Sequence, residues 1–528
     1  MEIILNNVIL KLSENESVLR EKVQKALGVR DREIVSMKII KKATDARKKD
    51  NIVFVYSLLV EISIKKDFSR NKDVKISDFS ENLTIPRLNA AKRPVIVGFG
   101  PAGMMAALWM ARAGMRPIIV ERGKCVEERE EDVRRFHESG VFEAESNVCF
   151  GEGGAGTFSD GKLTTGISDP RIRFVLKEFI KAGAPEEIYY EAHPHVGSDK
   201  LRIVVKNIRE EIKSLGGEVL FRHKFTGFRA ENGRIRTALI ERPDGIIMEI
   251  ETDDLVLAIG HSARDTFEML YNENVDMEPK PFSVGVRVEM SQKALDRDQY
   301  GDNYDNPKLK HAEYKICEHL PSGRSVYSFC MCPGGEVVAS NTIENSILVN
   351  GMSYFKRDFD NANSALLVSV NVEDYYHNSP LDGMYFQEEL EKKAFNPEYP
   401  YFAPVQLVGD FLEHKKSDAF GRVKPSYEPG TYFAEMDDIL PEFVCETLRE
   451  GIPKLSRKLR TLKNPDNVLT AVETRSSSPI KIPRDEQGYS SVRGIYPCGE
   501  GASYAGGIMS AAIDGLRICE FIRIKYSN

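Results

Sequence analysis

The sequence predicts an α/β fold built around a parallel sheet, and three observations support this prediction. An apolar strand pattern at residues 94–97 runs directly into a glycine-rich turn, a helical pattern and a second apolar strand at residues 117–120. A further strand, followed by glycines and a long helical pattern, lies near the other end of the chain at residues 495–522. The first 65 residues contain β-branched runs of their own. Strands that alternate with helices are typical of parallel sheets.

The length of 528 residues predicts several domains, since one domain usually has about 100–200 residues. We expect a small N-terminal α+β (βαββ) domain with its linker in residues 1–88. A Rossmann-like nucleotide-binding domain is expected to be discontinuous, with its first part in residues 89–281 and its C-terminal part in residues 466–528. Residues 282–465 are expected to form an inserted substrate or cap domain.

The composition is that of a soluble globular protein, with 41% hydrophobic and 29% charged residues. The formal net charge of −7 provides no overall attraction to nucleic acid or to anionic lipid. The first residues lack the basic flank and apolar run of a signal peptide, and no run of about 18 apolar residues can span a bilayer. The eight cysteines are dispersed along the chain. We therefore expect a cytoplasmic protein with no membrane partner and no disulfide framework.

The N-terminal unit is expected to contain an extended start, a short amphipathic helix and two strands, at residues 3–12, 17–27, 34–40 and 52–62. The turn between the two strands, residues 41–49, is the most basic stretch of the chain. A solvated hairpin tip is the usual explanation of such a run. Binding of a partner or of RNA through Arg47, Lys48 and Lys49 is the alternative.

The glycine-rich turn after residue 97 has the spacing Gly-x-Gly-x-x-Gly within a complete strand–helix–strand unit. Gly98 makes the tight turn, Gly100 lets the backbone approach a pyrophosphate, and Gly103 permits close packing of helix and strand. The second strand ends at Glu121, whose carboxylate can accept hydrogen bonds from the ribose hydroxyls of an adenosine. The sequence therefore predicts a dinucleotide site. Its expected residues in this segment are Gly98, Gly100, Pro101, Ala102, Gly103, Glu121 and Arg122.

The C-terminal segment favours FAD over NAD as the bound cofactor. Glu500 follows Gly499 at the end of a strand, where a carboxylate can hold a ribityl hydroxyl. A helix then begins after two glycines, and its positive end can face the flavin pyrimidine ring. An NAD-dependent Rossmann enzyme has no need of this second element. Further FAD contacts are expected from this segment, from the glycine-rich loop 151–163 and from the turn after the apolar strand 255–259: Gly156, Gly260, Gly499, Glu500, Gly506, Gly507 and Ile508.

Several segments resemble those of the uncharacterised FAD-dependent dehydrogenases, sometimes called NAD-utilising dehydrogenases, within the glutathione-reductase-like flavoproteins. The resemblance spans nearly the whole chain. It implies a bound FAD and a dehydrogenase or reductase of an organic substrate, and it does not indicate which substrate. The segments that carry it are residues 97–103, 151–163, 329–335, 473–479 and 499–508.

The catalytic candidates are few, and each also has a structural interpretation. Cys330 and Cys332 can relay electrons as a dithiol, but a Cys-x-Cys disulfide is strained, which favours packing beside the flavin. His195 and the neighbouring His193 are candidates for a general acid or a substrate contact. Arg475 can clamp an anionic substrate or form a structural salt bridge. His261 is interpreted as a surface or capping residue, and no metal site is expected.

The sequence contains no second Gly-x-Gly-x-x-Gly in a strand–helix–strand setting. NAD(P)H, where it is the electron donor, is therefore expected to bind only transiently at the flavin. The predicted function is that of an FAD-dependent oxidoreductase, which transfers a hydride or an electron pair through flavin N5 to or from a small organic substrate. Two alternatives stay open: a flavin monooxygenase, and a non-catalytic flavoprotein whose N-terminal domain binds a partner or RNA.

Overall fold

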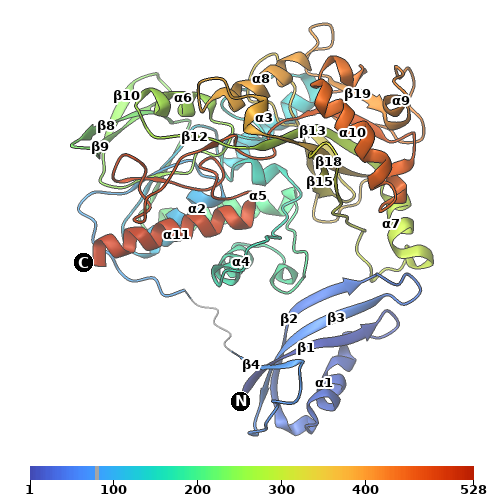
Figure 1. Ribbon diagram of the computed structural model, residues 1–528. Coiled ribbons are helices and arrows are strands. Elements are labelled where there is room, and N and C mark those ends of the chain that lie inside the picture. The colour runs from blue at the N-terminus through green and yellow to red at the C-terminus, as the bar shows by residue number, and fades with distance from the viewer. Residues whose placement is uncertain (78–82, 528) are drawn as a thin grey trace.

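The structure is a computed structural model that describes residues 1–77 and 83–527. Figure 1 shows a small N-terminal unit, drawn in blue, below two larger units that lie against each other. Helices and parallel strands alternate in one of the larger units, which confirms the predicted α/β class. Within the described residues, no helix is long and apolar enough to cross a membrane.

The N-terminal unit is an antiparallel sheet of order β2-β3-β1-β4 with helix α1 against one face. Alternate residues of β1 and β3, such as Leu5 and Leu58, pack on Val23 of α1, because successive side chains of a strand point to opposite faces. The short strand β4 adds to the expected βαββ pattern. The elements are β1 (Glu2–Lys11), α1 (Leu19–Leu27), β2 (Ile34–Asp45), β3 (Val53–Ile62) and β4 (Val74–Ile76).

The base of the hairpin between β2 and β3 lies against the rest of the chain, and the basic residues 47–49 at its tip are exposed, as expected for a solvated tip. The backbone N–H of Lys42 donates to Tyr190 O at 2.7 Å, and the N–H of Ala192 donates to Lys42 O at 2.8 Å. Asn303 Nδ2 donates to Lys49 O at 2.8 Å. The N-terminal unit is thus attached next to the segment that contains His193.

A five-stranded parallel sheet of order β23-β11-β5-β6-β7 forms the centre of the parallel-sheet unit. Its strand β23 comes from the C-terminal segment and pairs with β11, so residues far apart in the chain share one sheet. The five strands are β5 (Val95–Val97), β6 (Ile118–Glu121), β7 (Glu218–Phe221), β11 (Leu255–Leu257) and β23 (Ile495–Pro497). Every residue of β5, β6, β11 and β23 is buried, as expected for a sheet covered on both faces, whereas the edge strand β7 is only partly buried.

Helices cover one face of this sheet and a small antiparallel sheet covers the other. On the helical face α2 packs closely on α11, because Gly515 allows the two backbones to approach: a Cβ there would lie 2.2 Å from Ala102 O. The helices of this unit are α2 (Pro101–Arg112), α3 (Val126–Ser139), α4 (Arg171–Lys181), α5 (Ser198–Ser214), α6 (Arg264–Asn272) and α11 (Ile508–Ser527). The strands of the small sheet are β8 (Lys224–Glu231), β9 (Arg234–Glu241) and β10 (Ile247–Glu251).

The mixed-sheet unit is built on a seven-stranded sheet of order β14-β15-β18-β13-β21-β19-β20. Its central strand β13 pairs with both β18 and β21. The strands are β13 (Phe282–Ser291), β14 (Cys317–His319), β15 (Ser325–Cys332), β18 (Asn361–Val370), β19 (Ala403–Leu407), β20 (Thr431–Phe433) and β21 (Val468–Glu473). Strand β21 lies beyond residue 465, so this sheet extends further along the chain than the expected 282–465 segment.

Helices and two small strand pairs complete the mixed-sheet unit. The helices are α7 (Gln292–Tyr300), α8 (Asp382–Lys393), α9 (Val408–Leu412) and α10 (Glu442–Leu455). Strands β16 (Glu336–Ala339) and β17 (Val349–Met352) form a hairpin. Strands β12 (Glu278–Pro279) and β22 (Ile480–Lys481) pair where the chain enters and leaves this unit, so the two crossings are tied together.

Candidate functional site

A cavity of about 1130 Å³ lies where the carboxyl ends of the parallel strands meet the mixed-sheet unit. Small-molecule pockets usually have volumes of roughly 300–1,000 Å³, so this cavity has room for a large cofactor and a further ligand. The carboxyl edge of a parallel sheet is also where α/β folds bind their ligands. The main lining segments are residues 97–102, 120–122, 149–151, 154–156, 159–167, 258–263, 328–332, 473–476 and 498–511.

The predicted FAD contacts gather in this cavity, with the exception of Gly103, which packs behind its wall. Cys330, Cys332 and Arg475 also line it, whereas His195 does not. The residues that line it are Gly98, Gly100, Pro101, Ala102, Glu121, Arg122, Gly156, Gly260, Gly499, Glu500, Gly506, Gly507 and Ile508.

Packing of the protein requires two of the three glycines in the first turn, Gly98 and Gly103, but not Gly100. A Cβ on Gly98, whose φ is +93°, would lie 2.3 Å from Ala258 O, and a Cβ on Gly103 would lie 2.0 Å from Gly98 O. The packing of the turn therefore requires these two glycines. At Gly100 the nearest atom to such a Cβ, Gly154 Cα, is 3.8 Å away, and φ is −75°. Neither packing nor backbone conformation requires glycine there.

Gly506 presents the same situation at the start of α11, because a Cβ there would meet nothing within 4 Å. Both Gly100 and Gly506 line the cavity, so side chains at these positions would occupy ligand space. The residues present thus fit a dinucleotide that approaches both helix starts. The N-terminus of α2 has no side-chain cap, which leaves backbone N–H groups of its first turn available to a phosphate.

Glu121 stabilises the site as well as facing it. Its carboxylate accepts hydrogen bonds from the N–H groups of Phe99 (2.9 Å), Gly123 (2.9 Å) and Gly151 (3.0 Å). A carboxylate offers about four acceptor positions, so it keeps capacity for a ribose hydroxyl. Sequence analysis predicted the ribose contact and missed the structural one. Arg122, beside it, is held by Glu145 at 2.5 Å and Asp265 at 2.8 Å.

Arg129 is a site-forming residue that sequence analysis missed. Its side chain is fully buried and donates hydrogen bonds to four backbone carbonyls of the loop that lines the cavity. The acceptors are Asn147 O (2.8 Å), Glu152 O (2.6 Å), Val148 O (2.9 Å) and Gly154 O (3.0 Å). The sequence did contain a signal, because its spacing of three residues from Val126 and four residues from Val133 places Arg129 on the apolar face of α3.

Glu500 faces the cavity with no hydrogen-bond partner for its side chain in the described part of the chain. Burial raises its pKa to about 7, while the nearby Lys280 acts in the opposite direction. Glu500 is partly buried, and a carboxylate withdrawn from bulk solvent without a partner fits a donor supplied by a ligand. A ribityl hydroxyl is such a donor.

The two cysteines of the predicted pair lie at the end of β15. Desolvation raises the pKa of Cys330 to about 12 and the pKa of Cys332 to about 11. Both thiols are therefore protonated at neutral pH, and the thiolate is the reactive form in disulfide exchange. Both are free cysteines in this structure. Cys332 is buried, whereas Cys330 is exposed where it lines the cavity. The protonated state of both thiols disfavours an electron relay.

His195 is packed between elements, outside the cavity. Its Nε2 lies 3.0 Å from Phe355 O, its ring stacks on that of Phe355, and burial lowers its pKa. These contacts indicate a structural role. His193 does line the cavity and lies 3.3 Å from Glu313.

His261 lines the cavity, which corrects its interpretation as a surface or capping residue. Burial, together with the nearby Arg475 and Arg264, lowers its pKa to about 4. The imidazole is therefore neutral at pH 7. Sequence analysis could not place His261 beside Arg475, because this arrangement depends on the packing of two separate units.

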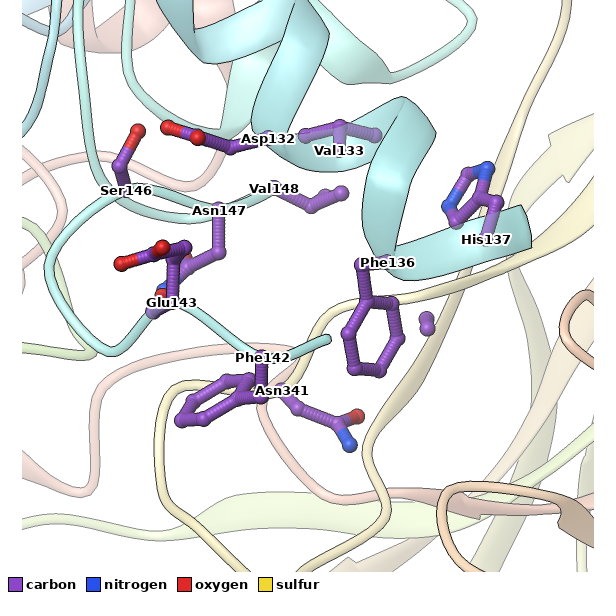
Figure 2. A pocket seen from close by; sticks show the side chains of 11 residues that line it. Asp132, Val133, Phe136, His137, Phe142, Glu143, Ser146, Asn147, Val148 and Asn341 are labelled. Atoms are coloured by element: carbon purple, nitrogen blue, oxygen red, sulfur yellow. The ribbon is translucent and has the colours of Figure 1, made fainter. Parts of the chain in front are cut away.

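A second, much smaller pocket lies between α3 and the loop that follows it (Figure 2). Its volume of about 10 Å³ is roughly the space that one water molecule requires. Phe136, Phe142 and Val148 form its apolar side, and Asp132 and Ser146 lie at its polar end. This pocket is too small for a cofactor or an organic substrate.

Comparison with known proteins agrees with a flavoprotein. Residues 281–476 match the family described as "FAD-dependent protein, C-terminal domain-like", and residues 2–61 match a domain of unknown function. An uncharacterized protein of Clostridium beijerinckii is 48% identical over 537 residues, which cover 100% of this chain and 99% of that protein. The chain belongs to the same family as this clostridial protein. The family match supports FAD as the cofactor.

Solved structures with some similarity also include flavoproteins. A geranylgeranyl bacteriochlorophyll reductase-like protein from Thermoplasma acidophilum has a TM-score of 0.37 and 12% identity, covering 83% of this chain and 79% of that chain. A flavoprotein/dehydrogenase from Cytophaga hutchinsonii has a TM-score of 0.36 and 14% identity, covering 82% and 78%. At such scores the similarity carries no conclusion about the reaction.

Proposed function

We propose that the protein is an FAD-dependent oxidoreductase, a dehydrogenase or reductase that acts on a small organic substrate in the cavity between the two larger units. One observation carries this proposal. One cavity is lined by Gly100 and Gly506, two glycines that the fold itself does not require, and also by residues of the mixed-sheet unit. The family match over residues 281–476 supports the same cofactor.

The residues that would hold FAD come from two segments of the parallel-sheet unit that are far apart in the sequence. The turn at Gly98 and Gly100 and the start of α2 would receive the pyrophosphate. Glu121 would accept from the ribose, and Glu500 would accept from the ribityl chain. The start of α11 would face the pyrimidine ring with the positive end of its dipole. When bound, FAD supplies two-electron redox chemistry.

The other residues around the cavity hold its walls in place and shield the cofactor and substrate from water. Arg129 fixes the loop that closes one side of the cavity. The sheet of the mixed-sheet unit covers the other side with Ser328, Cys330 and Glu473 and limits access of water. The substrate would lie between this sheet and the cofactor. A transient nicotinamide donor belongs to the same proposal, because a cavity of this size can admit a second ligand.

The experiment is an anaerobic titration of the purified yellow protein with NADH and then NADPH, followed by the visible absorption of the flavin. Bleaching by one nucleotide supports a nicotinamide-driven reductase and identifies the donor. If neither nucleotide bleaches the flavin but dithionite still reduces it, NAD(P)H is not the donor. The proposal is then limited to oxidation of an organic substrate. Oxygen consumption that matches substrate consumption would instead indicate a monooxygenase.

A further inference from the structure

Two buried arginines share one carboxylate behind the wall of the cavity. Arg475 donates from Nε to Glu391 Oε1 at 2.8 Å and from Nη2 to Glu391 Oε2 at 2.5 Å. Arg264 Nη2 lies 3.3 Å from Glu391 Oε1. Relative exposure is 6% for Arg475, 7% for Arg264 and 0% for Glu391. All three charges are therefore inside the protein.

The buried part of this cluster carries one more positive than negative charge, and the next nearest acid, Glu388, is only partly buried and also acts on both arginines. Two guanidinium groups face a single carboxylate, and the nearby Glu388 is paired with Lys392 at 2.6 Å. Burial of an unpaired charge is unfavourable, and proteins normally compensate it. A bound anion in the cavity would supply the missing negative charge.

Arg475 is the member of the cluster that reaches the cavity. Three of its N–H groups are engaged, two by Glu391 and one by Thr342 Oγ1 at 2.6 Å. A guanidinium has five N–H donors, so two remain for a ligand. Planar donors of this kind suit carboxylate and phosphate oxygens.

His261 adds a neutral polar group beside this charge. Its Nδ1 lies 3.1 Å from Ser262 Oγ, and when the serine hydroxyl donates, Nε2 carries the hydrogen and can donate to a ligand. Burial, followed by the two arginines, lowers the pKa of His261, so it contributes no further positive charge at neutral pH.

The wall begins beside the turn expected to hold the pyrophosphate, because β11 pairs with β5, and it extends to the mixed-sheet unit. His261 follows β11 of the parallel-sheet unit, whereas Arg475 follows β21 of the mixed-sheet unit. The wall thus lies where the two units meet, and the pyrophosphate is expected at the start of α2. A ligand held here would also contact the mixed-sheet unit.

We propose that Arg475 and His261 bind an anionic group of the substrate, a carboxylate or a phosphate, so that the substrate is an organic anion. This inference rests on the proposed function only in assigning the ligand as a substrate. The excess positive charge of the two arginines over Glu391 would favour a bound anion whether or not the protein is an oxidoreductase.

The test uses benzoate and inorganic phosphate as anionic probes and benzamide as the neutral counterpart of benzoate. Binding to the purified holoprotein is followed by calorimetry and by the difference absorption of the flavin. We expect at least one of the anions to bind the wild type more tightly than benzamide. Arg475→Gln should lower the affinity for that anion by about tenfold or more, as expected for loss of a charge-assisted hydrogen bond. The affinity of the variant for benzamide should equal that of the wild type.

Two further variants keep the result interpretable. Arg475→Lys keeps the charge and loses the planar fork, so we expect an intermediate affinity. Arg324→Gln is the matched control, because Arg324 pairs with Asp374 at 2.7 Å outside the cavity lining. It should bind the anions as the wild type does. Thermal unfolding of each variant confirms that it is folded.

Three outcomes would overturn the inference. The first is equal anion affinity in the wild type and Arg475→Gln, and the second is failure of both anions to bind the wild type. The third is loss of FAD from Arg475→Gln with unchanged anion binding, which would assign the charge to the cofactor. Calorimetry on protein that contains no FAD separates this test from failure of the proposed function, because the anion site is then measured without the flavin.

Discussion

The guanidinium of Arg129 donates a hydrogen bond to the carbonyl of Gly154 at 3.0 Å, and this contact connects helix α3 to the glycine-rich turn. Gly154 packs on that turn: a Cβ on it would lie 3.1 Å from Gly100 Cα. A buried charged side chain therefore sets the position of the loop that faces the expected cofactor phosphates.

Replacement of Arg129 should disturb both stability and cofactor binding. Arg129→Ala leaves four carbonyls without their donor and opens a cavity in the fully buried position. We expect a loss of about 3 kcal/mol or more in the free energy of unfolding, and a lower flavin content. Urea unfolding and flavin absorbance measure the two effects.

The matched control is Arg134→Ala on the same helix. Arg134 is exposed and pairs with Glu131 and Glu138 on its own helix. Exposed ion pairs contribute about 1 kcal/mol or less, so this variant should behave nearly as the wild type. Equal effects of the two substitutions would contradict the role given to Arg129.

The shared carboxylate predicts an asymmetry between two substitutions. Glu391→Gln leaves two buried guanidinium groups without a counter-charge and should destabilise the protein by about 3–5 kcal/mol. Arg475→Gln leaves Glu391 paired with Arg264 and should destabilise it much less. Chemical unfolding of both variants without added anion tests this order, and the reverse order would exclude the charge imbalance.

Glu500 predicts a pH dependence of the protein without FAD. Its pKa rises from an ordinary value of 4.5 to about 7 in the folded state, so the folded protein binds this proton more tightly than the unfolded chain does. Its contribution to stability is thus greatest below pH 4.5 and declines as the pH rises to about 7. Glu500→Gln should remove this part of the decline. Urea unfolding at pH 5 and pH 8 measures it, and an identical pH dependence in both proteins would contradict the assignment.

The protonated state of Cys330 and Cys332 predicts that flavin alone is reduced. A reductive titration with dithionite should consume two electrons per flavin in the wild type and in Cys330→Ser. Consumption of four electrons in the wild type and two in the variant would show that the thiols form a redox pair after all.

The parts of the site that could be predicted from the sequence are those fixed by local geometry. Gly98, Gly100 and Gly103 follow from the spacing of one turn, and Glu121 follows from the end of the next strand. The partnership of Arg475 with Glu391 joins β21 to α8, and no local pattern encodes it. Helical spacing with Val126 and Val133 places Arg129 on the buried face of α3, but no local pattern encodes the loop carbonyls that it binds.

Some elements of the fold could also not be assigned from the local sequence, because their place depends on the strands with which they pair. The run Val468–Glu473 reads as a buried strand in either large unit, and only its pairing with β13 and β19 places it in the mixed-sheet unit. Strand β4 has three residues and is defined by its pairing with β1. Sequence periodicity does not detect so short an element.

The most direct test of the account is the FAD content of purified Gly100→Val. The fold does not require glycine at this position, so the variant should fold but lack FAD, because its side chain would occupy the expected pyrophosphate position. It should unfold like the wild type from which FAD has been removed, since bound FAD stabilises the folded state. Gly227→Val on β8, outside the cavity lining, is the control and should keep its FAD. A folded, colourless Gly100→Val protein is the predicted result. A folded Gly100→Val protein that keeps one FAD per chain would contradict the assignment of this cavity.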